Sequence, residues 1–221
     1  LSMVQGDSFY IKGKDIENKD LLYDPSIHYQ VMMEWEKPYM KKLVQHVKPK
    51  GRVLEIGFGL GYSSNEIQKY DIESHTIIEP IQIKELKAWS KKQKHKVNIV
   101  KGYWQQVLKT LGTFDTIFFD DAPTKTFGDP NNIRVYKFFY SLLNNHVNKN
   151  ANFTWYLDKK LYWLCHPDVD FTIKPYKINV PKHCNYAKGN ILYLPLIKFK
   201  DGIVKDENHI ALNNNFQLQL I

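Results

Sequence analysis

Apolar and polar positions follow two different spacings along the chain. From Ile27 to Val47 apolar residues recur every three or four positions, which predicts an amphipathic helix. Runs rich in β-branched residues at 52–56, 75–79, 97–100 and 114–119 predict strands, and the segments between them, at 62–69, 83–92 and 104–111, have helical spacing. Strands and helices that alternate in this way form a parallel, doubly wound sheet, so we expect an α/β fold.

The rest of the chain continues this pattern. A helix is expected at 133–147, and strands are expected at 152–157, 171–178 and 190–199. Residues 1–25 are polar and irregular, and the end of the chain is expected to be peripheral. We find neither an internal repeat nor a linker rich in Gly, Ser or Pro. The sequence therefore predicts an N-terminal arm at 1–26 and one domain at 27–221.

Composition and charge narrow the possible functions. The 221 residues are 43% hydrophobic and 24% charged, which excludes a disordered tail and a disulfide-stapled miniprotein. The formal net charge is +8, but of the 31 basic residues only Arg52 and Arg134 are Arg. Because proteins that read nucleic acids favour the planar fork of Arg, we interpret the excess charge as a solvated surface. A polyanion site near the basic run 91–96 is the alternative.

Nothing in the sequence indicates a membrane span, a leader or a metal site. No window approaches the roughly 18 consecutive apolar residues that a span requires, and the first residues are neither basic nor apolar. The cysteines, Cys165 and Cys184, have no CxxC partner, so they favour neither a metal site nor a disulfide framework. We expect a cytoplasmic protein without a metal ion.

A glycine-rich turn follows the first strand of the alternating region. Gly57, Gly59 and Gly61 have the spacing GxGxG, whereas the dinucleotide fingerprint is GxGxxG. Glycine permits a sharp turn and a close approach of the backbone to a ligand. Glu79 ends the next strand, where its carboxylate can accept hydrogen bonds from both ribose hydroxyls. The glycine turn and Glu79 together predict a nucleoside cofactor. The alternative is that the glycines only allow close packing of the turn.

Acidic residues supply the candidate chemistry. Asp120 and Asp121 follow the strand at 114–119, and strand alternation allows only one of them to face a pocket easily. We expect that residue to be Asp120, with a turn-forming role before Pro123 as the alternative. Glu36 lies in the predicted first helix, where an exposed acid paired with a Lys is the ordinary outcome.

The ExGxGxG turn is similar to that of class I S-adenosylmethionine-dependent methyltransferases, and the chain as a whole resembles the guanidinoacetate N-methyltransferase family. The fungal protein arginine N-methyltransferases resemble it too, over the second part of the pattern. The resemblance rests on VMMEWEKPYM (31–40), GRVLEIGFGLGYSS (51–64), HTIIEP (75–80), HKVNIVKGYWQQVLKTL (95–111) and FDTIFFDDAP (114–123), and more loosely on VPKHCNYAKGNILYLPLI (180–197).

The resemblance implies a Rossmann-like, doubly wound, mostly parallel seven-stranded sheet with an N-terminal helical lid segment, and S-adenosylmethionine as cofactor with S-adenosylhomocysteine as product. In the arm, Phe9 or Tyr10 would cover the cofactor, unless the arm is a disordered tail. Gln105 replaces a family Glu at the adenine. The implied cofactor-binding residues are Met32, Met40, Glu55, Gly57, Gly59, Leu60, Gly61, Tyr62, Ser63, Ser64, Glu79, Trp104, Gln105 and Asp120.

The resemblance also implies that Glu36 and Asp120 hold a guanidino group. Two carboxylates can fix the planar cation, Glu36 as orienting partner and Asp120 as proton acceptor. Asp158 and Lys159 stand where the family binds the substrate carboxylate with a Leu-Thr pair. Asp158 would repel that carboxylate and suit an amino group, as in arginine or agmatine, whereas Lys159 could pair with it.

The expected activity is therefore methyl transfer to a guanidino nitrogen of a small molecule, either guanidinoacetate or a related compound. Two alternatives remain: methylation of protein arginine side chains, and a catalytically silent module of the same fold that binds nucleic acid. We expect no membrane partner, and either a monomer or a homodimer.

Overall fold

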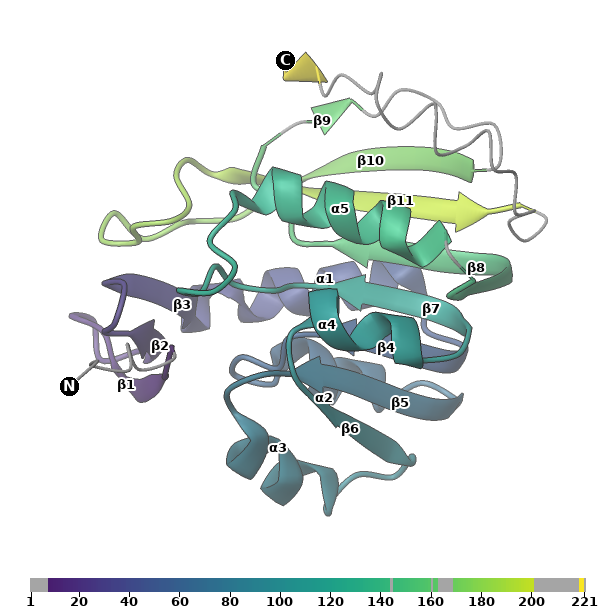
Figure 1. Ribbon diagram of the computed structural model, residues 1–221. Coiled ribbons are helices and arrows are strands. Elements are labelled where there is room, and N and C mark those ends of the chain that lie inside the picture. The colour runs from purple at the N-terminus through teal and green to yellow at the C-terminus, as the bar shows by residue number, and fades with distance from the viewer. Residues whose placement is uncertain (1–7, 144, 160, 163–168, 201–218, 221) are drawn as a thin grey trace.

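The computed structural model describes residues 8–143, 145–159, 161–162, 169–200 and 219–220. Its centre is a seven-stranded sheet in the order β10-β11-β8-β7-β4-β5-β6 (Figure 1). Only β11 runs antiparallel to its neighbours, so the expected mostly parallel, doubly wound sheet is confirmed. The strands are β4 (Gly51–Ile56), β5 (Ile72–Glu79), β6 (Val97–Lys101), β7 (Phe114–Phe119), β8 (Val147–Trp155), β10 (Val169–Lys177) and β11 (Ile191–Phe199).

Helices cover both faces of this sheet. Side chains alternate along β4, so Val53 packs against the helix α1 while Leu54 and Ile56 pack on the opposite face, where α5 lies. Trp104 and Phe138 pack on this second face, in the same hydrophobic cluster as Leu54 and Ile56. The helical segments are α1 (Lys37–Val47), α2 (Tyr62–Ile67), α3 (Ile83–Ser90), α4 (Trp104–Val107), the 3-10 turn η2 (Leu108–Thr110) and α5 (Asn131–Leu143).

The N-terminal region differs from the expected helical lid segment. Residues 11–33 form a three-stranded antiparallel sheet of β1 (Ile11–Lys14), β2 (Asp20–Asp24) and β3 (Tyr29–Met33). A 3-10 turn, η1 (Glu34–Glu36), follows, and the helix α1 begins only at Lys37. The predicted helix start at Ile27 was wrong because the spacing of residues 31–35 resembles a helix, whereas cross-strand pairs such as Leu22 with Met32 determine the structure.

The strand order reverses between β4 and β7, which places two loops side by side at the carboxyl ends of these strands. Gly57 N donates to Ile78 O (3.0 Å) and Asp120 N donates to Ile56 O (3.1 Å), so the loop backbones continue the pairing of their strands. Ligands of doubly wound sheets bind at such a reversal. The glycine loop (57–61) and the acidic loop (120–123) therefore meet at the expected location of a site.

A small pair, β9 (Leu161–Tyr162) with β12 (Gln219–Leu220), was not predicted from the sequence. Most of the expected peripheral C-terminal segment, together with Cys165, lies outside the described residues. Of the helices that the structure describes, none combines the length and the apolar character that crossing a membrane would require.

Candidate active site

The glycine loop adopts a backbone that only glycine accommodates easily. Gly57 has φ +84°, and a Cβ there would lie 2.3 Å from the carbonyl oxygen of Asp120. Gly59 has φ +55°, and its Cβ would lie 2.8 Å from Met32 Sδ. Met32 thus lies against the loop, where its sulfur also accepts a bond from Leu60 N (3.2 Å). The close approach of loop and neighbours requires the absence of side chains.

Beneath the loop, Glu55 organises a buried polar network. Its carboxylate accepts hydrogen bonds from Ser63 Oγ (2.5 Å) and Ser64 Oγ (2.7 Å), and it contacts His75 Nε2 at 2.8 Å. The side chains of Glu55 and His75 have no exposed surface. These side chains therefore bind one another and join the start of α2 to β4 and β5. None of them lines the glycine-loop cavity, so the cofactor contacts that the resemblance implies for Glu55, Ser63 and Ser64 stay predictions. No pattern in the sequence pointed to His75.

Glu79 lies at the end of β5, as expected. Its carboxylate accepts hydrogen bonds from the backbone N–H groups of Phe58 (3.0 Å), Ile81 (2.8 Å) and Gln82 (3.0 Å). Burial raises the pKa of Glu79, which the three N–H donors oppose. A carboxylate has about four lone-pair positions, so one remains for a ligand hydroxyl.

A cavity of about 40 Å³, here called the glycine-loop cavity, joins Glu79 to the expected adenine residues; its lining includes Tyr10, Gly57, Glu79, Trp104, Gln105 and Phe127. Gln105 Oε1 is buried there without a hydrogen-bond partner among the described residues. Such an orphaned acceptor would be satisfied by an amino group like that of adenine. The remaining space holds about one water molecule, so a nucleoside would have to displace the side chains of Tyr10 and Phe127.

Other predicted cofactor residues lie around the loop in different settings. The Tyr62 hydroxyl is buried without a hydrogen-bond partner among the described residues, and Lys37 Nζ lies 5.8 Å from its ring centre. Leu60 is half-buried beside it. Met40 belongs to α1, is fully buried in the core and is not among the residues that line the glycine-loop cavity, so its expected position at the border of the cofactor stays a prediction.

The two predicted catalytic acids lie in one cavity. Glu36 from η1 and Asp120 from the end of β7 both line a space of about 70 Å³, here called the acidic cavity. Glu36 Oε1 accepts hydrogen bonds from Met33 N (2.9 Å) and from the Tyr186 hydroxyl. Burial raises the pKa of Glu36 to about 7. Burial, followed by the nearby charge of Glu36, also raises the pKa of Asp120 well above its usual range.

Asp121 and Arg134 are functional candidates that the sequence reasoning missed. Arg134 Nε donates to Asp121 Oδ1 (2.7 Å), and Trp104 Nε1 donates to Asp121 Oδ2 (2.9 Å). Arg134, on α5, is only 3% exposed, and both residues line the acidic cavity. Asp121 thereby joins the acidic cavity to the glycine-loop cavity. The rarity of Arg in a Lys-rich chain was the signal that could have identified Arg134.

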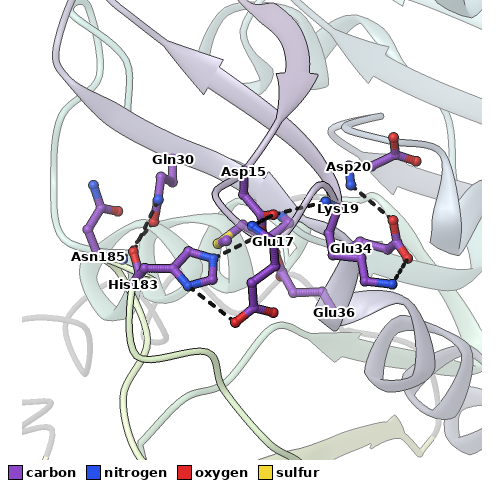
Figure 2. A network of polar contacts seen from close by, with 10 residues as sticks. Asp15, Glu17, Lys19, Asp20, Gln30, Glu34, Glu36, His183 and Asn185 are labelled. Atoms are coloured by element: carbon purple, nitrogen blue, oxygen red, sulfur yellow. Dashed lines mark hydrogen bonds and ion pairs between the residues drawn. The ribbon is translucent and has the colours of Figure 1, made fainter.

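The loop at 178–190, between β10 and β11, closes the other side of the acidic cavity with Tyr186. Figure 2 shows how this loop is held to the N-terminal sheet. His183 Nε2 contacts Asp15 Oδ2 at 3.0 Å, and the Gln30 side chain bonds to both His183 O (3.2 Å) and Asn185 N (2.7 Å). The β1–β3 sheet thus positions the tyrosine that binds Glu36.

Beyond the acidic cavity lies a larger one of about 380 Å³, here called the outer cavity. The two share Tyr29, Asn131, Arg134, Asp158 and Tyr186. Asp158 is half-buried, and burial raises its pKa. The exposed Lys159 lines only the outer cavity of the two. The structure therefore places both predicted tail-binding residues beyond the acid pair.

The N-terminal arm reaches the glycine-loop cavity through Tyr10, whereas Phe9 is 53% exposed. Ser8 Oγ accepts a bond from Lys125 N (3.1 Å), so the arm is tied to the loop that follows β7. Of the two lid candidates, Tyr10 is the one that the structure places over the cavity.

The sequence is similar to those of known methyltransferases. Residues 20–151 match the sequence profile of guanidinoacetate N-methyltransferase. Over 127 residues the chain is 34% identical to the protein named protein arginine N-methyltransferase 2 of Candida glabrata, a match covering 54% of this chain and 31% of that relative. The chain thus spans about a third of the length of this relative.

Solved structures share the fold. Spermidine synthase from Thermotoga maritima superposes with a TM-score of 0.53 at 14% identity, covering 96% of this chain and 80% of that one. A putative O-methyltransferase from Klebsiella pneumoniae gives 0.51 at 14% identity, with 76% and 81% covered. At such identities the likeness shows the fold alone. Since the profile matches more than half of its residues, the chain belongs to the guanidinoacetate N-methyltransferase family.

Proposed function

We propose that the protein is an S-adenosylmethionine-dependent N-methyltransferase that acts on a guanidino nitrogen of a small molecule. The observation that carries this proposal is the common cavity of Glu36 and Asp120, which adjoins the glycine loop through Asp121. Two carboxylates around one small space suit a planar cation with N–H donors on several edges.

The glycine loop, Glu79 and Gln105 would hold the cofactor. The glycines leave backbone room, Glu79 keeps one acceptor position for a ribose hydroxyl, and the buried Gln105 Oε1 would accept from the adenine amino group. When bound, S-adenosylmethionine supplies a methyl group on a sulfonium leaving group. Tyr10 of the arm would close over the cavity and exclude water.

The acid pair would supply orientation and proton transfer. A guanidinium is a poor nucleophile, because it is protonated at neutral pH and its lone pair is delocalised. Glu36, fixed by Met33 N and Tyr186, would orient one edge of the group. Asp120 would accept the proton that the nitrogen releases as the new bond forms, and its raised pKa suits an acceptor.

The name of the Candida glabrata relative favours an alternative, methylation of an arginine side chain in a protein. The reacting group is the same, so the acid pair would serve either substrate. Turnover of free guanidino compounds separates the two. The nucleic-acid alternative predicts salt-dependent RNA binding without methyl transfer.

The test is methyl transfer from labelled S-adenosylmethionine to free guanidino compounds. Glu36→Gln and Asp120→Asn keep the side-chain shapes but remove the charges, so kcat/KM should fall by at least about a hundredfold in each. Asp71→Asn, at an exposed position before β5, is the matched control and should retain full activity. Undiminished turnover in both amide variants would refute the assigned roles.

A further inference from the structure

The lining of the outer cavity indicates which kind of guanidino compound is the substrate. This inference rests on the proposed function. A guanidino group held between Glu36 and Asp120 would direct the rest of its molecule away from the glycine loop. The acidic cavity shares Asn131, Arg134 and Asp158 with the outer cavity, so this is the direction in which the tail can extend. With about 380 Å³, the outer cavity has room for a tail of several heavy atoms.

Where the acidic cavity meets the outer cavity, some charged side chains have partners and others do not. Arg134 is committed to Asp121 by its Nε (2.7 Å) and also donates to the carbonyl oxygens of Asp121 and Asp129. Asp129 pairs with Lys137 at 2.6 Å. For the half-buried Asp158 carboxylate, no side chain within the described residues donates a hydrogen bond. Burial raises its pKa, and the charge of the solvent-exposed Lys159 and its own backbone N–H oppose this shift without occupying the carboxylate with a side-chain partner. Asp158 is therefore the acid at this boundary with capacity for a ligand.

A second observation comes from Tyr156, which lines the acidic cavity. Its hydroxyl is buried and has no hydrogen-bond partner in the part of the chain that the structure describes. Glu36 and Asp158 line the same cavity as Tyr156. Burial, followed by the charges of these two acids, raises the pKa of Tyr156. A buried hydroxyl without a partner is costly, and a ligand N–H donor would satisfy it.

We propose that the substrate carries an ammonium group on its tail, bound by Asp158 in the outer cavity, and that the Tyr156 hydroxyl accepts a hydrogen bond from the substrate. The substrate class is then a free guanidino compound with an amino group, such as a guanidinoalkylamine or a guanidino amino acid. A carboxylate tail alone would meet Asp158 close to the Glu36 and Asp120 pair and be repelled.

The test compares three tails on the same reacting group: agmatine with an ammonium, guanidinoacetate with a carboxylate, and ethylguanidine without charge. The protein should turn over agmatine with a kcat/KM at least about tenfold above that for guanidinoacetate. Asp158→Asn should reduce the ratio of agmatine to ethylguanidine turnover about tenfold, because it removes the charge and keeps the shape. Asp71→Asn, matched in chemistry and exposed, should leave this ratio unchanged.

A ratio within one preparation does not depend on the fraction of folded protein, so a partly unstable variant still gives an answer. Tyr156→Phe should raise the KM for agmatine several-fold, since only the hydroxyl is lost. Arginine as a fourth substrate distinguishes an amino acid tail from a simple amine.

The possible failures are distinguishable. If ethylguanidine and guanidinoacetate are methylated as well as agmatine, and Asp158→Asn changes no ratio, the ammonium inference is wrong while the proposed function stands. Methylation of an arginine-containing peptide but of none of the free compounds would overturn both in favour of a protein substrate. If no guanidino compound is methylated at all, the proposed function and this inference fail together.

Discussion

At the scale of single residues, Glu36 shows how burial changes a carboxylate. In a helix its ordinary environment would be solvent and a nearby Lys, yet it is 2% exposed and bonded to Met33 N and the Tyr186 hydroxyl. Both partners donate to the same oxygen. Among the described residues none donates a hydrogen bond to the other oxygen, which can therefore meet a cationic ligand in the acidic cavity.

The pKa of Glu36 predicts a pH dependence of stability. The folded protein releases the proton near pH 7, whereas the unfolded chain releases it near 4.5, so Glu36 destabilises the fold increasingly as pH rises through this interval. The full effect is on the order of 3 kcal/mol. Glu36→Gln keeps both hydrogen bonds and loses the titration. Its melting temperature relative to the parent should therefore be higher at pH 8 than at pH 5, and an equal difference at both would contradict the assignment.

Gly57 carries a second prediction at this scale. Gly57→Ala places a Cβ 2.3 Å from Asp120 O at a φ of +84°, so both strain and a backbone clash oppose it. We expect a loss of at least about 2 kcal/mol in the free energy of unfolding, together with loss of cofactor binding. Gly13→Ala is the matched control, since a Cβ added at Gly13 would meet nothing within 4 Å. Urea unfolding of the two variants measures the difference, and equal stabilities would contradict the clash.

At the scale of elements, the N-terminal sheet and the loop at 178–190 act as one wall of the site. Residues far apart in the chain meet there: His183 contacts Asp15, and Gln30 bridges His183 and Asn185 (Figure 2). This connection fixes the loop that brings Tyr186 to Glu36. On the proposed function, the antiparallel β1–β3 sheet would be part of the substrate side, while the glycine loop would belong to the cofactor side.

His183→Ala tests this connection. Without the contact to Asp15 at 3.0 Å, the loop should open more often, so amide hydrogen exchange at 178–190 should become faster and the KM for the guanidino substrate should rise several-fold. Lys14→Ala removes an exposed ion pair with Asp20 on the same sheet and should change neither, because such pairs contribute at most about 1 kcal/mol. Unchanged exchange in the His183 variant would show that the loop is held by other contacts.

At the scale of the whole molecule, three cavities follow one another across the carboxyl edge of the sheet. Asp121 belongs to the first two, and Asp158 and Arg134 belong to the last two. Cofactor and substrate would therefore approach from opposite sides of the acidic loop. A ligand in the glycine-loop cavity must displace Tyr10, which couples binding to movement of the arm.

This coupling gives a prediction for ligand binding. S-adenosylhomocysteine at a hundredfold excess over its Kd should stabilise the protein by about 2.7 kcal/mol, which raises the melting temperature by roughly 5–10 °C for a chain of this length. Tyr10→Ala should weaken this binding about tenfold, since the ring, once displaced from the cavity, would lie over the bound ligand and this aromatic contact is lost. Phe9→Ala, at the exposed neighbouring residue, should bind as the parent does. Tighter binding by the Tyr10 variant would instead show that Tyr10 only competes with the ligand.

How far the sequence predicted the structure depends on the range of the interactions involved. The strand at 114–119 was predicted to the residue, because a short β-branched and apolar run between turn residues is a local signal. The N-terminal sheet was missed, because the register of Leu22 with Met32 is set by partners distant in the chain. Strand alternation predicted that Asp120 faces the pocket and that Asp121 does not. In the structure Arg134 and Trp104 donate hydrogen bonds to the Asp121 carboxylate, and Asp121 lines the site.

Local sequence was enough to specify the doubly wound sheet, the glycine loop and Asp120 as a candidate acid, since periodicity, glycine spacing and strand-end position are properties of neighbouring residues. Glu36 was singled out only by the family resemblance. Only the tertiary structure established that Glu36 and Asp120 share a cavity, that Glu55 accepts a hydrogen bond from Ser63, and that Asp158 lines the outer cavity. These outcomes depend on burial and on contacts between distant segments, and both exist only once the chain has packed.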